Sequence, residues 1–356
     1  MADMVANKNT NQGSVDKTGE IISLMSANRI NSLDLYRGIC GYGVAITHFY
    51  AYLYQDLFSE YVSLLFVEWF FVLSGFVLYP QLVKVLNDKR HVKTFYIRRW
   101  VRTLPLFALA LFCASMMTGN LFNGDFFKYL VFAQKLLPGF VSDDFYPVAW
   151  SLSVEEYFYL FFPLFLLLIS KGNFIFRVLL LLAGMTVIKV VLSDSVDLSF
   201  YRTGTLFRLD SILLGFIGAH FKDRIVQHGK VVIIAIFALF AVFLYVKEAI
   251  YIGQIGNIGK VLFVALLQLN SFFLLFGFIL ADGFIRNNRL KKFCGLLANQ
   301  TYSIYLFHLL FLYIIKANFM AVEGIFIYYL AALFVVSFAI FEFFEKPLLS
   351  LRPKYK

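Results

Sequence analysis

The sequence predicts an all-α integral membrane protein, a bundle of about ten transmembrane helices with both termini in the cytoplasm. Of its 356 residues, 60% are hydrophobic and only 15% are charged, which excludes an ordinary soluble protein. Clusters of charged residues, proline and glycine divide the chain into apolar stretches of spanning length. Lys and Arg gather in alternate connections, as expected for loops that face the cytoplasm. The predicted spans are 35–54, 62–83, 103–118, 147–169, 174–192, 203–221, 231–247, 260–281, 300–317 and 324–343.

The polar N-terminal segment shows no apolar core followed by a small-residue cleavage site, so no signal peptide is predicted. We expect a disordered cytoplasmic tail over 1–28 and one transmembrane domain over 29–356. The long outward connection 119–146 contains the short apolar run FFKYLVFAQKLL, which predicts an interfacial or re-entrant helix.

The net charge of +10 is spread over several loops, which does not favour nucleic acid as a partner. Anionic lipid headgroups and a phosphorylated cytosolic ligand explain the charge better. The three cysteines lack the spacing of a metal site or a disulfide framework, so we expect no metal.

The first predicted span contains two ionisable residues, Arg37 and His48, which are eleven positions apart. On a helix they differ by roughly 20° in direction and by about 16 Å in height. If Arg37 lies at one membrane surface, His48 lies near the middle of a hydrocarbon core roughly 30 Å thick. A base at that depth is costly to maintain, so His48 is a candidate functional residue.

The densest basic cluster, KRHVKTFYIRRWVRTLP, lies between the second and third spans. Arg99 and Arg102 are three residues apart and share one helix face. Arginine suits phosphate binding. The alternative is a positively charged anchor at the cytoplasmic surface.

Further polar residues interrupt the second and fourth spans. Glu68 should face the interior, because a carboxylate facing lipid is strongly disfavoured. Ser74 precedes a glycine, a pair that either lines a site or lets another helix approach closely. Trp150 suits a membrane interface. Glu155 and Glu156 point about 100° apart on a helix, so both can hardly touch one site.

Two later spans carry ionisable residues of the same kind. Arg208 and Asp210 lie in FRLDSILLG, and His308 lies in TYSIYLFHLL. Arg208 suits either a buried ion pair with a carboxylate of another helix or a catalytic role. His308 suits either a catalytic role or a hydrogen bond to a backbone carbonyl.

Several familiar motifs are missing from the sequence. It contains no Walker loop, no dinucleotide-binding GxGxxG after a strand, no HExxH and no GxSxG elbow. ATP-driven transport, nicotinamide redox chemistry and zinc hydrolysis are therefore unsupported.

The order of these motifs resembles the membrane-bound acyltransferase 3 family, which includes O-antigen and other polysaccharide O-acetyltransferases. Arg37 with His48 looks like the family's arginine, ten residues, histidine pattern, and Arg99 with Arg102 looks like its paired-arginine pattern. FFVLSGFVL, WSLSVEEYFYL, the RLD of 208–210 and YSIYLFH are similar to its other signatures. Each motif is weak by itself, whereas their shared order is specific.

The resemblance implies a bacterial inner-membrane enzyme that moves an acyl group, commonly acetyl, from cytosolic acyl-CoA to a hydroxyl of a cell-surface glycan or lipid-linked sugar. The CoA phosphates would bind Arg99, Arg102 and Arg37, and the acyl group would reach His48 as general base or transient acyl carrier. Glu155 or Glu156 would orient His48 or the acceptor. Arg37 and His48 would then be the two ends of one channel.

Two other functions fit the same charges. A transporter or flippase of the envelope polysaccharide pathway could use them as a relay, although the inverted repeats typical of many transporters are not evident in the sequence. A non-catalytic partner in a polysaccharide complex would tolerate substitution of the arginines and of His48.

Overall fold

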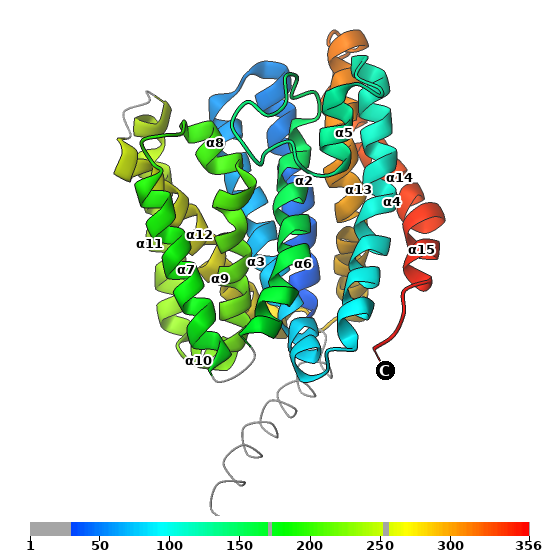
Figure 1. Ribbon diagram of the computed structural model, residues 1–356. Helices are drawn as coiled ribbons and strands as arrows, with labels where there is room; N and C mark the ends of the chain where they lie inside the picture. Colours follow the sequence, from blue (N-terminus) through cyan, green and yellow to red (C-terminus); the bar gives the residue numbers. More distant parts are fainter. Residues whose placement is uncertain (1–29, 170–172, 252–255, 356) are drawn as a thin grey trace, which may run out of the picture.

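The computed structural model describes residues 30–169, 173–251 and 256–355, and this part of the chain forms helices and connecting turns without a strand. Figure 1 shows long helices running side by side in one bundle. The predicted tail over 1–28 lies outside the described residues.

All ten predicted spans are largely helical, although Gly204 interrupts the span over 203–221. Several helices extend beyond the predicted limits, because their polar end turns lie outside the apolar stretch. The elements in chain order are α2 (Asn31–Tyr54), α3 (Leu57–Asn87), α4 (His91–Thr118), α5 (Gly124–Leu130), η1 (Pro147–Ala149), α6 (Trp150–Leu168), α7 (Phe174–Val191), α8 (Leu198–Thr203), α9 (Thr205–His220), α10 (Lys222–Gln227), α11 (Gly229–Tyr251), α12 (Asn257–Leu280), η2 (Ala281–Phe284), α13 (Asn288–Asn318), α14 (Ile325–Ile340), η3 (Phe341–Glu345) and α15 (Lys346–Ser350).

Seven helical segments of the described chain are long and apolar enough to cross a membrane. They are α3, α4, η1 with α6, α7, α11, α12 with η2, and α14 with its continuation to Ser350. The remaining three predicted spans correspond to α2, α9 and α13. These three are helices too, but they fall short of the same apolarity or length, so ten membrane crossings stay a prediction.

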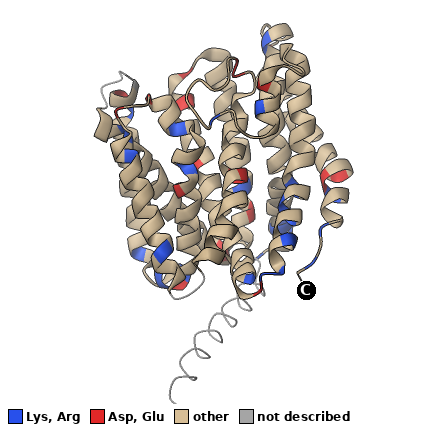
Figure 2. Cartoon of the chain, viewed as in Figure 1, with Lys and Arg blue, Asp and Glu red and all other residues tan. Residues whose placement is uncertain are grey.

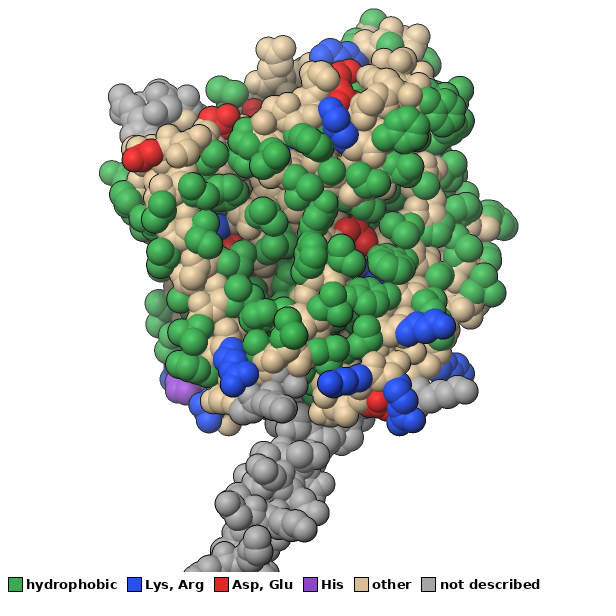
Figure 3. All heavy atoms as spheres, viewed as in Figure 1, with side chains coloured by type: hydrophobic (Ala, Val, Ile, Leu, Met, Phe, Trp, Pro, Cys, Tyr) green, Lys and Arg blue, Asp and Glu red, His purple; other side chains and the backbone are tan. Residues whose placement is uncertain are grey.

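Apolar side chains cover much of the lateral surface (Figure 3). Phe237 and Tyr245 on α11 and Leu168 on α6 are each more than two thirds exposed. Lys and Arg gather around the end that holds α10, the start of α4 and the C-terminus, which we call the basic end (Figure 2). An apolar girdle between polar ends is typical of a multi-pass membrane protein.

The centre of the bundle is built by two helix pairs, α2 with α13 and α3 with α9. The second pair is very close. A Cβ atom on Gly75 would lie 1.8 Å from the carbonyl oxygen of Ile212, and one on Gly215 would lie 1.9 Å from that of Val72. Gly75, the glycine that follows Ser74, thus permits close approach of another helix, which is one of the two roles predicted for this pair.

The connection 119–146 lies at the opposite end from the basic end, with the short helix α5 inside it. Only 124–130 is helical, so the predicted interfacial helix is shorter than the apolar run that suggested it. Asp125 accepts from Lys128 Nζ at 2.9 Å and from the backbone N–H groups of Ser142 and Asp143. The bond from Lys128 contributes most to lowering the pKa of Asp125 to about 2.

Candidate active site

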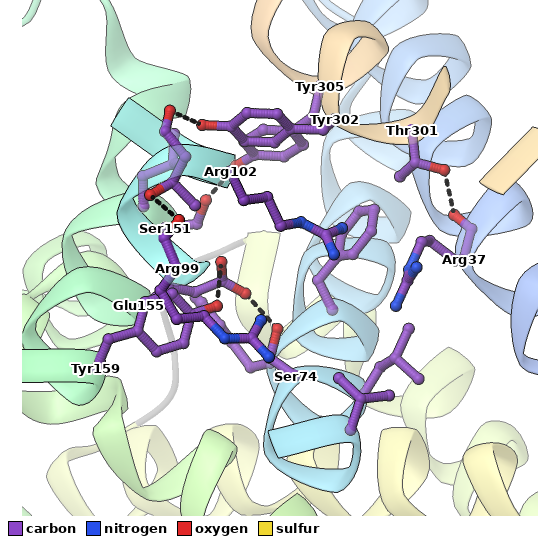
Figure 4. Close-up of a pocket in the computed structure, with 16 residues that line it drawn as sticks. Arg37, Ser74, Arg99, Arg102, Ser151, Glu155, Tyr159, Thr301, Tyr302 and Tyr305 are labelled. Atoms are coloured by element: carbon purple, nitrogen blue, oxygen red, sulfur yellow. Dashed lines mark hydrogen bonds between the residues drawn. The ribbon is translucent and has the colours of Figure 1, made fainter. Parts of the chain in front are cut away.

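The first cavity of interest lies where α2, α3, α4, α6 and α13 meet, and we call it the arginine pocket. Its volume is about 760 Å³, including solvent at its mouth. Figure 4 shows Arg37 from α2 and Arg99 and Arg102 from α4 extending their guanidinium groups into it. Its other polar lining residues are Ser74, Thr103, Ser151, Glu155, Tyr159, Thr301, Tyr302 and Tyr305. The structure thus brings together the three arginines that the sequence assigned to phosphate binding.

The charges of the arginine pocket are unbalanced. Within the described residues, no carboxylate oxygen lies within 4 Å of a side-chain nitrogen of Arg37, Arg99 or Arg102. The Arg99 guanidinium instead lies over the Tyr159 ring, 5.4 Å from its centroid. Glu155 is the one acidic lining residue. Three guanidinium groups against one carboxylate make a site for a polyanion.

Glu155 has two defined partners inside the arginine pocket. The Ser74 hydroxyl donates to one of its carboxylate oxygens, and the Tyr159 hydroxyl donates to the other at 3.1 Å. Glu156 is buried and lines neither this pocket nor the one around His48. The two glutamates therefore diverge, as their helical spacing predicted, and no hydrogen bond joins either of them to His48.

A second cavity, which we call the histidine pocket, lies further toward the end that holds α8. The empty space in it, including solvent at its mouth, is about 440 Å³. Its polar and aromatic lining residues are His48, Ser63, Glu68, Trp150, Arg202, Arg208 and Tyr305. They come from six elements, α2, α3, α6, α8, α9 and α13, so that residues far apart in the sequence meet around one histidine.

His48 is oriented by a second histidine. Its Nδ1 lies 2.9 Å from Nε2 of His308. The Nδ1 of His308 lies 2.8 Å from the carbonyl oxygen of Tyr305 and 3.1 Å from that of Ile304. His308 thus makes the expected hydrogen bond to a backbone carbonyl. It also contacts the candidate base, so a catalytic role for His308 stays a prediction.

The geometry fixes the tautomers of the neutral histidine pair. A carbonyl oxygen can only accept, so Nδ1 of His308 carries its proton and Nε2 is left with a lone pair. His48 must then donate from Nδ1 to that lone pair. The lone pair of His48 Nε2 is consequently free to accept a proton from a molecule in the histidine pocket.

The two cavities share one residue, Tyr305. Its hydroxyl lies 2.6 Å from Ser151 Oγ and 2.9 Å from the carbonyl oxygen of Val148, and its ring packs edge-on against Phe70. Only 7% of Tyr305 is exposed. The single channel expected from Arg37 to His48 is therefore two pockets with Tyr305 between them, because a side chain of α13 fills the space that helical spacing alone leaves open.

Two buried ion pairs support the histidine pocket. Arg208 on α9 pairs with Glu68 on α3, so Glu68 faces the interior and Arg208 meets a carboxylate of another helix, both as expected. Asp210 pairs with Lys189 on α7. Trp150 lines the pocket, and its ring packs edge-on against Phe71.

A sequence model of the acyltransferase domain of the acyltransferase 3 family matches residues 30–341. The chain belongs to this family. The match covers every residue that lines the two pockets, so the resemblance seen in the order of the motifs is confirmed.

Curated relatives agree with the family. Proteins of Staphylococcus aureus strains COL and MSSA476, both named "Putative O-acetyltransferase", are 28% identical to this chain over 228 residues. The match covers 57% of this chain and 36% of each relative, so the chain spans about a third of the length of these relatives. An uncharacterised protein of Haemophilus influenzae is 28% identical over 151 residues, 37% of this chain and 61% of its own. No solved structure matches the chain.

Several lining residues were not predicted from the sequence, and Tyr159, Arg202 and Tyr305 are three of them. Tyr305 precedes His308 by one helical turn, and Tyr159 follows Glu155 by one, so both shared a face with a residue already singled out. Arg202 gave a weaker signal, because Gly204 breaks the predicted span 203–221 into α8 and α9.

Proposed function

We propose that this protein is a membrane O-acyltransferase of the bacterial inner membrane, which moves an acyl group from cytosolic acyl-CoA to a hydroxyl of a cell-surface glycan or its lipid-linked precursor. The observation that carries the proposal is the oriented pair His48–His308, one side chain away from a pocket lined by three arginines. The names of the S. aureus relatives support acetyl as the acyl group.

The arginine pocket would bind the donor. CoA carries a diphosphate and a 3′-phosphate, which match three guanidinium groups that lack carboxylate partners. The pocket lies on the side of the basic end, which the positive-inside rule assigns to the cytoplasm. The CoA phosphates would stay there, while the pantetheine arm extends along the bundle toward His48.

The histidine pocket would carry out the transfer. The acceptor hydroxyl gives its proton to Nε2 of His48 while its oxygen attacks the thioester carbonyl carbon. The carbon–sulfur bond breaks, CoA leaves as a thiolate, and the proton on Nε2 passes to that sulfur. The products are an O-acyl ester and CoA. His308 keeps the base in the productive tautomer through its bond to His48 Nδ1.

Tyr305 would control the path between the pockets. The thioester can reach His48 only if the Tyr305 side chain moves away from Ser151 and the Val148 carbonyl. Because Tyr305 also presents the carbonyl that orients His308, the residue that separates the pockets also supports the base.

The test is acyl transfer by the purified protein with His48→Ala. We expect transfer from acetyl-CoA to fall by about 10² to 10⁴-fold, the usual contribution of a general base. His308→Ala should lower kcat with little change in the KM for acetyl-CoA, since it removes only the group that orients His48. The control is His228→Ala, because His228 is exposed after α10 and lines neither pocket. Near-normal transfer by folded His48→Ala would refute the proposal.

A further inference from the structure

The histidine pocket holds an arginine that has no direct ion-pair partner among the described residues. Arg202, from α8, lines the pocket and is half-buried. Within the described chain, no carboxylate lies within 4 Å of its guanidinium group and no hydrogen bond to that group is found. The carboxylate that interacts with it electrostatically is Glu60, which is exposed in the first turn of α3.

Arg208, the second arginine of this pocket, is only partly satisfied. It is 2% exposed and pairs with Glu68 through one terminal nitrogen. Its Nε and Nη1 atoms are buried and find no partner within the described residues. Oε1 of Glu68 is also buried without a partner, so one of these two nitrogens can bind it and the other can bind a ligand.

The formal charge of the pocket is therefore positive. Arg202 and Arg208 contribute two positive charges, Glu68 contributes one negative charge, and His48 acts as a neutral base. The remaining walls include the indole of Trp150 and the ring of Tyr305. Aromatic faces with a polar edge accommodate a sugar ring, and guanidinium groups accept an anion beside it.

We propose that the histidine pocket recognises an anionic acceptor, with Arg202 binding a phosphate or carboxylate group close to the hydroxyl that is acylated. Arg208 contributes one further guanidinium nitrogen to the same anion. This inference rests on the proposed acyl transfer, because it assigns the acceptor of the same site. A phosphate of a lipid carrier and a carboxylate of an acidic sugar offer the same chemistry to Arg202.

The experiment compares the full-length protein and its variants in cells that make the native acceptor. Envelope glycan is analysed by mass spectrometry for the amount of acyl group and for the unit that carries it. Arg202→Gln removes the charge, and Arg202→Lys keeps it. Lys316→Gln is the matched control, because it removes one positive charge from the last turn of α13 and lines neither pocket.

We expect Arg202→Gln to lower acylation by at least about tenfold, the effect of losing one charge-assisted contact. Arg202→Lys should keep a large share of it, and Lys316→Gln should match the wild type. The acylated unit should itself carry, or directly adjoin, a phosphate or carboxylate, and the mass assigns which of the two. The KM for acetyl-CoA of purified Arg202→Gln should equal that of the wild type.

Two results of the experiment in cells would overturn this inference. One is wild-type acylation by Arg202→Gln, and the other is an acylated unit with no anionic group on it or next to it.

A separate experiment tests binding of a bilayer phosphate, using purified protein in vesicles of phosphatidylcholine with or without phosphatidylglycerol. If the defect of Arg202→Gln vanishes without phosphatidylglycerol, Arg202 binds lipid and the inference is wrong. His48→Ala in the same cells reports on the proposed function separately, since its failure to reduce acylation would refute acyl transfer itself.

Discussion

Arg98, Arg99 and Arg102 form a natural comparison on α4. Arg99 and Arg102 line the arginine pocket, whereas Arg98 points elsewhere and donates to the carbonyl oxygen of Pro353 at 2.7 Å. All three lie in one basic cluster of the sequence. Because Arg98 points in a different direction from the other two side chains, Arg99 and Arg102 are candidate phosphate ligands, whereas Arg98 binds the C-terminal segment.

Arg99→Ala and Arg102→Ala should each raise the KM for acetyl-CoA by about 10 to 100-fold, because each removes a charged hydrogen-bond donor worth about 1.5–3 kcal/mol. The kcat should change much less, since the proposed transfer takes place in the other pocket. Arg98→Ala is the matched control and should leave the KM near the wild-type value. Steady-state kinetics of purified protein give both parameters. Equal increases for all three variants would mean that the cluster acts only through general surface charge.

The sequence predicted residues well where helical periodicity decides their direction. The eleven-residue spacing correctly placed Arg37 and His48 on the inner face of one helix, and the adjacent positions of Glu155 and Glu156 correctly predicted that they diverge. Periodicity does not say which side chains of other helices stand opposite. The contact of His48 with His308 and the position of Tyr305 between the pockets depend on packing of α2, α3, α6 and α13, which no local pattern encodes.

The close approach of α3 and α9 depends on two glycines, and it brings Glu68 opposite Arg208. Gly75→Ala or Gly215→Ala should destabilise the protein by at least about 3 kcal/mol, the upper part of the range for overpacked cores. The reason is that the new methyl group meets backbone, which cannot rotate away. Thermal unfolding in detergent measures the effect.

Gly184→Ala on α7 is the control for these two variants. Apart from its chain neighbours and the backbone of its own helix, nothing in the described chain lies within 4 Å of the position that its Cβ would occupy, so the higher helix propensity of alanine should leave stability unchanged or slightly increased. If Gly75→Ala and Gly184→Ala unfold at the same temperature, the α3–α9 contact does not limit the stability of the fold.

At the scale of elements, hydrophobic stretches predicted the helices but not all of their limits. The starts of α4 and α13 are polar, and they continue the helices by about twelve residues before the predicted spans. The span predicted over 203–221 is divided by Gly204, whose backbone is extended. This break separates Arg202 from the helix of Arg208, and both nevertheless line one cavity.

Over the whole molecule, part of the polar chemistry lies in helices that are least typical of membrane spans. α2, α9 and α13 fall short of the apolarity or length of the other seven segments, and they carry Arg37, His48, Arg208, Asp210 and His308. More apolar helices such as α7 and α11 are largely exposed, as expected for helices that face lipid. An outer layer of apolar helices thus permits an interior with charges that the bilayer would otherwise exclude.

In the proposed reaction, acetyl-CoA enters from the basic end, the acceptor enters from the other end, and the two meet at His48. The most direct measurement uses vesicles of defined orientation, with labelled acetyl-CoA supplied only at the basic end and native acceptor glycan only at the other. Wild-type protein should label the acceptor, and His48→Ala should not. Labelling only when acetyl-CoA and acceptor are on the same side, or equal labelling by His48→Ala, would contradict the account.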